Sequence, residues 1–362
     1  MAVLEVALWV LFGFGLSLAF WLTARPRAKP RLRLGAADVP SRTGTIARAR
    51  VDSRPLPRLI ELGDDLEITV IGTAPCLEEL TEFDDLRPSR VDLIYEDEAE
   101  LEEPTAPIAR ILTSARGHTD KGRHRPRNED RLLVLPQRSV FVVADGMGGH
   151  RGGEIASELA VRALDTAYAR GDFHGVVDSR RPIPRRAREL SLAIQQANHA
   201  IYNTAATNPT LAEMGTTLVV AKFSPRKQRV YIGHVGDSRC YRLRCGAIRQ
   251  LTTDHNLGSV GVAGPNAGQL VRALGVEASV TIDLIIDRPL ANDVYCLCSD
   301  GLSKMLTDEE IRLVIEREKD LEAAVNSLIE QANARGGKDN VTVVLVRVLE
   351  AVASHLSVSN AR

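Results

Sequence analysis

One apolar run ends abruptly in an aspartate and a cluster of glycines. Residues 139–144 read SVFVVA, an unbroken stretch that is typical of a strand buried on both faces. Asp145 follows at the end of this strand, and Gly146, Gly148 and Gly149 come next. Because glycine has no Cβ atom, its main chain approaches a ligand closely. The stretch predicts a rigidly held carboxylate that suits a hard cation, although a tight turn in which Asp145 bonds its own backbone has the same pattern.

Three further acidic motifs stand in order along the chain at the predicted edges of strands. They are Asn-Glu-Asp at 128–130, Ser-Asp-Gly at 299–301 and Lys-Asp-Asn at 338–340. Two carboxylates 4 Å apart repel each other by about 4 kcal/mol at an effective dielectric constant near 20, so a site that collects several needs cations. Oxygen ligands without a His or Cys cluster select Mg²⁺ or Mn²⁺, and Asp145 is the expected bridging ligand.

A pair of such ions favours one kind of chemistry. Two divalent ions about 3.5–4 Å apart hold and acidify a water and clamp an in-line displacement at phosphorus. Phosphoester hydrolysis by a metal-activated water is therefore the leading expectation.

A basic loop precedes the first acidic motif. It carries Lys121, Arg123, Arg125 and Arg127. A guanidinium fork matches phosphate oxygens in geometry and charge, which makes Arg125 the expected phosphate-binding residue. The alternative is an ordinary solvated loop.

Composition excludes several other classes of function. The 362 residues carry a formal net charge of −1, so no charge excess indicates a nucleic-acid partner. With 44% hydrophobic residues the chain can bury one large core and still carry extra segments. Its five cysteines lack zinc-ligand spacing and are expected to be reduced in a cytosolic domain.

The first residues predict one transmembrane helix. Residues 2–23 are apolar except for Glu5, and a helix of this length spans about 33 Å, enough for the hydrocarbon core of a bilayer. Five basic residues follow between 25 and 33, which places the rest of the chain in the cytoplasm, at the inner membrane. A cleaved secretory signal is the competing interpretation.

Residues 24–104 are expected to form a linker that is first basic and then acidic. Residues 61–103 contain sixteen acidic residues against two arginines, yet 66–71 and 91–95 have the pattern of strands. A soluble tether is the favoured interpretation, and a small module that docks a partner is the alternative.

Residues 105–349 are expected to form one α+β domain, followed by a tail at 350–362. Apolar residues at helical spacing predict four covering helices at 154–169, 185–207, 308–318 and 321–334. Strands are expected at 108–115, 139–144, 217–223, 229–235, 238–243, 280–286, 293–298 and 341–348. Strands and helices in blocks favour packed antiparallel sheets flanked by helices over a doubly wound parallel sheet.

The motifs along this domain resemble those of the type 2C metal-dependent protein phosphatases, in their bacterial form. They occur in family order: Arg-x-x-Asn-Glu-Asp at 125–130, Asp-Gly-Met-Gly-Gly-His at 145–150, Gly-Thr-Thr at 215–217, Gly-Asp-Ser-Arg at 236–239, Leu-Thr-Thr-Asp-His at 251–255, Arg-Ala-Leu-Gly at 272–275, Ser-Asp-Gly-Leu at 299–302 and Lys-Asp-Asn at 338–340. The resemblance covers about residues 110–348. It implies a four-layer α/β/β/α sandwich with two central antiparallel sheets and a two-metal centre that hydrolyses phosphoserine and phosphothreonine, opposing a protein kinase.

The resemblance also implies a role for each matching residue. Asp145 would bridge two Mg²⁺ or Mn²⁺ ions, Gly146 would offer its carbonyl, and Arg125 would bind the phosphate. The remaining ligands would be Asp300 and Asp339 on one ion, Glu129 and Asp130 in support, partly through water, and Asp237, which with Asp300 helps to hold a third, weaker ion in bacterial members.

Two departures from the family pattern affect the expected chemistry. Met147 stands where animal relatives have a histidine proposed as general acid, so protonation of the leaving group would fall to metal-bound water or to His150. Residues 256–271 form a short glycine-rich version of a longer bacterial flap, which predicts altered substrate selection. A phosphoprotein-binding module without catalysis and a hydrolase of small phosphoesters are the competing hypotheses.

Overall fold

The structure, a computed structural model, describes residues 88–96, 111–149 and 151–349. The predicted transmembrane helix at 2–23, most of the predicted linker, His150 and the tail at 350–362 lie outside these residues. Within the described ranges, no helix has the length and apolar character needed to cross a membrane.

The larger of two sheets has eight strands. Its order is β3-β4-β7-β8-β11-β1-β5, with β6 paired to β4. The strands are β3 (Asp130–Leu135), β4 (Val140–Met147), β7 (Leu218–Ser224), β8 (Arg229–Val235), β11 (Ile282–Asp287), β1 (Ser89–Tyr95), β5 (Val177–Asp178) and β6 (Gly215–Thr216). The hairpin of β3 and β4 sets Asp130 directly opposite Asp145, so this register brings two of the predicted site residues together.

The second sheet is antiparallel throughout, in the order β10-β9-β12-β13-β2. Its strands are β10 (Ala247–Gln250), β9 (Arg239–Arg244), β12 (Val294–Cys298), β13 (Val341–Leu349) and β2 (Leu112–Asp120). The buried cysteines Cys240, Cys296 and Cys298 lie in β9 and β12 as free thiols, as the sequence predicts.

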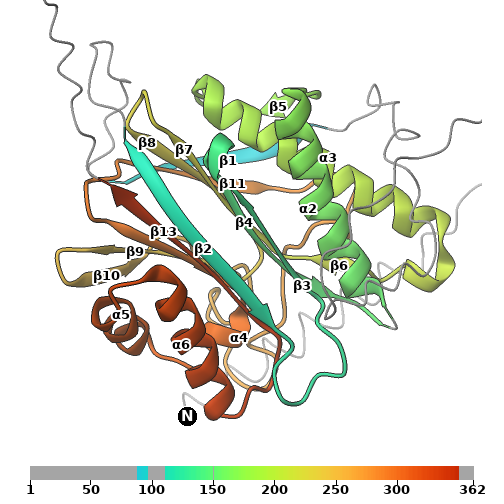
Figure 1. Cartoon of the computed structure of the whole chain (residues 1–362). Helices are drawn as coiled ribbons and strands as arrows, with labels where there is room; N and C mark the ends of the chain where they lie inside the picture. Colours follow the sequence, from blue (N-terminus) through green and yellow to red (C-terminus); the bar gives the residue numbers. More distant parts are fainter. Residues whose placement is uncertain (1–87, 97–110, 150, 350–362) are drawn as a thin grey trace, which may run out of the picture. The chain divides into compact units, whose positions relative to one another are not determined.

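Helices cover the outer face of each sheet (Figure 1). The pair α2 (Gly152–Arg170) and α3 (Arg185–Thr207) packs on the first sheet, and α5 (Asp308–Arg317) and α6 (Leu321–Ala334) pack on the second. The short helix α4 (Asp300–Ser303) follows β12, and two 3₁₀ turns lie at Pro136–Arg138 and Pro209–Leu211. Thr307 and Glu310 form a capping box that starts α5.

The apolar run at 139–144 lies mostly in strand β4 and is buried on both faces of the sheet. Val140 and Val142 pack in the core beneath α2 and α3, whereas Phe141 and Val143 pack between the two sheets. Successive strand residues point to opposite faces, so a strand with helices on one side and a sheet on the other is apolar at every position. The predicted α+β architecture with two sheets and flanking helices is confirmed.

Strand β1 departs from the prediction in two respects. It pairs in parallel with β11 and with β5, so this edge of the first sheet is not antiparallel. It also lies in the segment that the acidic composition assigned to a tether, so the predicted domain start at 105 was wrong for residues 89–95. Val91 is buried, and Leu93 and Tyr95 pack against the core under the helices, because apolar residues at every second position give β1 one face to bury.

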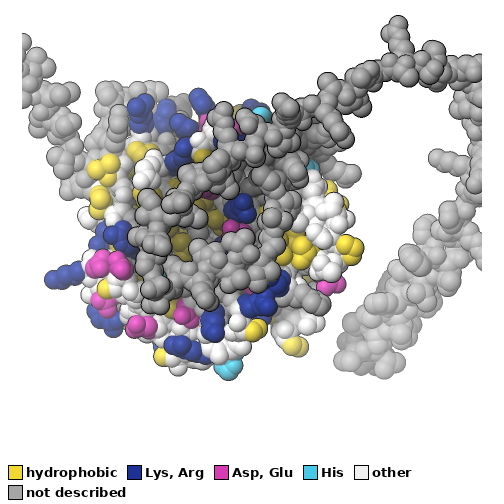
Figure 2. Space-filling model, turned by 45° about the vertical axis from the view of Figure 1, so that its right-hand side comes forward, with side chains coloured by type: hydrophobic (Ala, Val, Ile, Leu, Met, Phe, Trp, Pro, Cys, Tyr) yellow, Lys and Arg dark blue, Asp and Glu magenta, His cyan; other side chains and the backbone are white. Residues whose placement is uncertain are grey.

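Charged side chains are mixed on the face drawn in Figure 2. Basic side chains lie beside acidic ones where described residues are visible. This distribution agrees with the small net charge of the chain.

Candidate metal centre and active site

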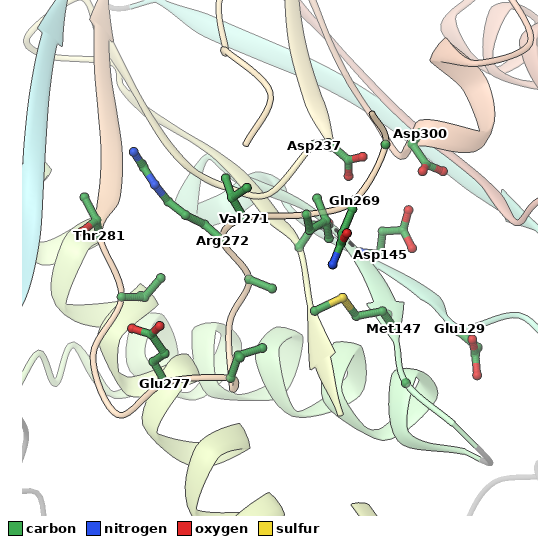
Figure 3. Close-up of a pocket in the computed structure, with 18 of the residues that line it drawn as sticks. Glu129, Asp145, Met147, Asp237, Gln269, Val271, Arg272, Glu277, Thr281 and Asp300 are labelled. Carbon is green, nitrogen blue, oxygen red and sulfur yellow. Dashed lines mark hydrogen bonds between the residues drawn. The ribbon is translucent and has the colours of Figure 1, made fainter. Parts of the chain in front are cut away.

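The predicted site residues surround one pocket of about 770 Å³. Figure 3 shows Asp145, Asp237 and Asp300 gathered at one end of it, with Arg272 and Thr281 at the other. The site residues that line it are Arg125, Glu129, Asp145, Gly146, Asp237, Asp300 and Asp339. Asp130 lies buried opposite Asp145 in the β3–β4 pair.

The main chain of Asp145 is fixed by two threonines. Its N–H donates to Thr217 Oγ1 at 3.1 Å, and its carbonyl accepts from Thr217 N at 2.8 Å and from Thr216 Oγ1 at 2.9 Å. Thr217 Oγ1 also lies 2.7 Å from Ser238 Oγ, beside Asp237 in the sequence. The Gly-Thr-Thr motif therefore holds the backbone of Asp145 and leaves its carboxylate free for a ligand.

Gly146 fits where no other residue does. Its N–H donates to the carbonyl of Glu129 at 3.2 Å, and a Cβ atom here would lie 2.1 Å from the carbonyl oxygen of Gly153. Ser157 Oγ donates to the same Glu129 carbonyl at 2.6 Å. The glycines of the motif thus let β4, the start of α2 and the loop before β3 come into contact.

Asp130 connects the first acidic motif to the Ser-Asp-Gly motif and to β13. Its Oδ2 accepts hydrogen bonds from Ser299 Oγ at 2.8 Å and from Thr342 Oγ1 at 2.7 Å. Burial raises the pKa of Asp130 to about 6. Its Oδ1 is buried and has no hydrogen-bond partner among the described residues. One oxygen is therefore held by the protein, and the other is left for a ligand.

Burial and neighbouring carboxylates raise the pKa of Asp145 and of Asp237 at this end of the pocket. Burial, followed by the charges of Asp130, Asp300, Asp237 and Asp339, raises the pKa of Asp145 well above its ordinary value. Burial and Asp300 raise the pKa of Asp237 to about 7, while Lys304 acts in the opposite direction. Such a cluster carries full negative charge only when cations are bound to it.

The donor set fits hard divalent ions. Asp300 Oδ1, like Asp130 Oδ1, is buried without a hydrogen-bond partner among the described residues. All side chains of the cluster offer carboxylate oxygens, which Mg²⁺ and Mn²⁺ prefer. The residues present therefore fit the metal ions that the sequence predicts.

Arg125 and the last acidic motif meet at the mouth of the site. Arg125 Nη2 donates to Asp339 Oδ2 at 2.8 Å, and half of the Arg125 side chain is exposed. Asn340 holds the loop around them, since its Nδ2 donates to the carbonyls of Lys121 and Arg127 and its Oδ1 accepts from Glu129 N. The basic loop is thus part of the site and not an independent solvated loop.

Several residues that hold the site residues in place by hydrogen bonds were not predicted from the sequence. Thr217, Ser299, Asn340 and Thr342 all bond to site residues or to the loop that carries them. Each of the first three stands inside a motif, so its position was a signal, whereas Thr342 is an ordinary polar residue of a strand. The glycine-rich segment 256–271 also contributes to the pocket, through residues 268–271.

A second cluster, of His234, His255 and Asp283, does not suit a metal ion. The potential ligand atoms of these residues lie within 4.8 Å of one another. However, His255 Nδ1 accepts a hydrogen bond from Gly236 N at 3.0 Å, and Arg272 Nη1 lies 3.2 Å from His255 Nε2 and donates to Asp283 Oδ1 at 2.7 Å. The guanidinium of Arg272 already supplies the positive charge at this cluster, which instead supports the backbone of Gly236.

Comparisons with known proteins agree with this geometry. A sequence model described as "Protein phosphatase 2C" matches residues 116–350. The serine/threonine phosphatase stp of Listeria welshimeri is 37% identical over 242 residues, which cover 63% of this chain and 93% of that protein. The serine/threonine protein phosphatase PstP of Mycobacterium tuberculosis is 35% identical over 257 residues, which cover 67% of this chain and 47% of that protein.

Solved structures give the same result. The catalytic domain of PstP in complex with two manganese ions superposes with a TM-score of 0.58 at 33% identity, covering 66% of this chain and all of that one. A serine/threonine phosphatase from S. agalactiae superposes with a TM-score of 0.59 at 30% identity, with the same coverage. The chain therefore belongs to the protein phosphatase 2C family of metal-dependent serine/threonine phosphatases.

Proposed function

We propose that this chain hydrolyses phosphoserine and phosphothreonine esters of proteins in the pocket around Asp145. The proposal rests on one pocket whose lining combines the half-exposed guanidinium of Arg125 with a cluster of carboxylates, those of Glu129, Asp145, Asp237, Asp300 and Asp339. Two bound Mg²⁺ or Mn²⁺ ions would supply an acidified water and positive charge for the phosphoryl group. The pocket extends from the carboxylates to Arg272 and Thr281, which gives room for a peptide beside the phosphate.

The carboxylates of the cluster other than Asp237 have proposed places at the two metal ions. Asp145 would bridge the two ions, with the main-chain bonds to Thr216 and Thr217 keeping its side chain in position. Asp300 and Asp339 would hold one ion, and Gly146 would offer its carbonyl. Glu129 and Asp130 would support the ions, partly through water.

Arg125 is proposed to bind and orient the phosphate. We expect Arg125→Ala to lower kcat/KM for a phosphothreonine peptide about 10- to 100-fold, because a charge-assisted hydrogen bond contributes about 1.5–3 kcal/mol. The neighbouring Arg127→Ala is the matched control, since its side chain is equally exposed and lies 3.9 Å from Glu154. Steady-state kinetics that show equal losses for both variants would contradict the role of Arg125.

Phosphate release from a phosphothreonine peptide tests the proposal as a whole. The full-length protein is expected to release phosphate with Mn²⁺ and to stop when EDTA is added. No release under any metal condition would favour the phosphoprotein-binding module without catalysis. Release that survives EDTA and exhaustive dialysis would contradict a metal-dependent mechanism.

We further propose that the chain acts at the inner membrane and reverses a serine/threonine kinase. Residues 2–23 are apolar apart from Glu5, and basic residues follow them directly. Deletion of 2–23 is expected to move the protein from the membrane pellet to the supernatant after cell fractionation. Recovery of the intact chain in the supernatant would contradict the anchor without affecting the catalytic proposal.

A further inference from the structure

Lys304 brings a positive charge into the carboxylate cluster. It follows the short helix α4 and donates from Nζ to Asp300 Oδ2, one helical turn away. It also lines the same pocket as Asp145 and Asp237. About half of its side chain is exposed, so its ammonium group lies at the edge of the cluster and not behind it.

The two oxygens of Asp300 have different partners. Oδ2 accepts from Lys304, whereas Oδ1 is buried without a partner among the described residues. Asp300 can therefore hold a metal ion through Oδ1 while Lys304 stays on Oδ2. Asp237 lines the same pocket as Asp300 and Lys304, and the positive charge of Lys304 acts on its carboxylate.

The charges of the site balance with two ions. Six carboxylates meet in the cluster: Glu129, Asp130, Asp145, Asp237, Asp300 and Asp339. Two divalent ions together with Arg125 and Lys304 supply an equal positive charge. Lys304 Nζ donates to Asp300 Oδ2, as the ammonium group of a lysine does beside a carboxylate.

We propose that the ammonium group of Lys304 occupies a cation position between Asp237 and Asp300. This chain then binds two divalent ions at the cluster and excludes a third ion from that position. The ammonium group repels an incoming divalent ion and already occupies Asp300 Oδ2. Asp237 then acts through its pairing with Lys304 and not as a metal ligand. This inference rests on the proposed assignment of the cluster as the metal site.

The number of bound Mn²⁺ ions tests the inference without measuring turnover. Equilibrium dialysis of the full-length protein, with bound manganese counted by atomic spectroscopy, is expected to give two ions for the native chain and for Lys304→Arg. Lys304→Gln keeps a polar side chain, one atom shorter, without the charge and is expected to bind one additional ion. Adding Asp237→Asn to Lys304→Gln should remove that additional ion.

Other numbers of bound Mn²⁺ ions would contradict the inference. Three ions on the native chain, or an unchanged two on Lys304→Gln, would show that Lys304 does not occupy a cation position. Asp145→Asn is the test of the underlying assignment, because it should reduce binding at the cluster. If Asp145→Asn binds as much Mn²⁺ as the native chain, the assignment of the metal site fails together with the inference.

Discussion

Replacing Asp145 by asparagine is expected to lower hydrolysis of a phosphothreonine peptide by about 10³-fold or more, because the stabilisation supplied by metal ions amounts to several kcal/mol. The fold should survive, since the surrounding hydrogen bonds use the main chain of residue 145 and not its carboxylate. Without metal the variant should even unfold at a higher temperature, because four neighbouring carboxylates disfavour the charge of Asp145.

Steady-state kinetics and thermal unfolding of the same preparation separate these effects. Asp300→Asn should behave in the same way, since the Asp300 carboxylate faces the same cluster. Ser303→Ala, in the same short helix, is a control that should keep full activity. Retained turnover in Asp145→Asn would contradict a metal role for this residue, and an unfolded variant would show that the aspartate is structural.

The second large effect is expected from Gly301→Ala. A Cβ atom at this position would lie 1.9 Å from the carbonyl oxygen of Asn340, in the buried contact between α4 and the start of β13. Alanine is a better helix former than glycine, so any loss comes from this collision. We expect the free energy of unfolding to fall by about 3 kcal/mol, and activity to fall with it, because Asp300 and Asp339 flank the contact.

Gly268→Ala provides the matched control for this prediction. No atom lies within 4 Å of a Cβ atom built on Gly268, and this residue lines the pocket that contains Asp300. Denaturant unfolding should therefore give a native-like stability for Gly268→Ala and a reduced one for Gly301→Ala. Equal stabilities would mean that the main chain near Asn340 moves aside easily, and that the Ser-Asp-Gly motif does not depend on close backbone approach.

The parts of the fold with strong periodicity could be predicted from the sequence. The helices at 185–207 and 321–334 begin and end where the structure has α3 and α6. Strand β4 was recognised because it is apolar at every position, and its two buried faces explain that pattern. Burial on a fixed face is the physical signal in each case.

Strands with a weak or conflicting pattern were predicted less well. The three alternating apolar residues of β1 gave residues 91–95 the pattern of a strand, but the surrounding acidic residues favoured a tether over a part of the domain. β3 was not predicted, because its apolar residues 132–135 form only a short run between Arg131 and Pro136. Its place is set by pairing with β4, which is a tertiary effect.

The residues of the candidate site could be predicted from the sequence, but their contacts could not. The motifs predicted the carboxylates and Arg125, and the structure places these residues around one pocket. The sequence could not show that Asp130 is held by Ser299 and Thr342, which lie 169 and 212 residues further along the chain. Nor could it show that Lys304, one turn beyond Asp300, faces the cluster. Such contacts depend on how the two sheets pack.

Anomalous X-ray diffraction from crystals grown with Mn²⁺ would locate the metal ions in the pocket. We expect two manganese peaks that share Asp145, with Asp300 and Asp339 as further ligands and no peak between Asp237 and Lys304. The absence of a peak at Asp145, or a peak only at the cluster of His234, His255 and Asp283, would contradict this expectation.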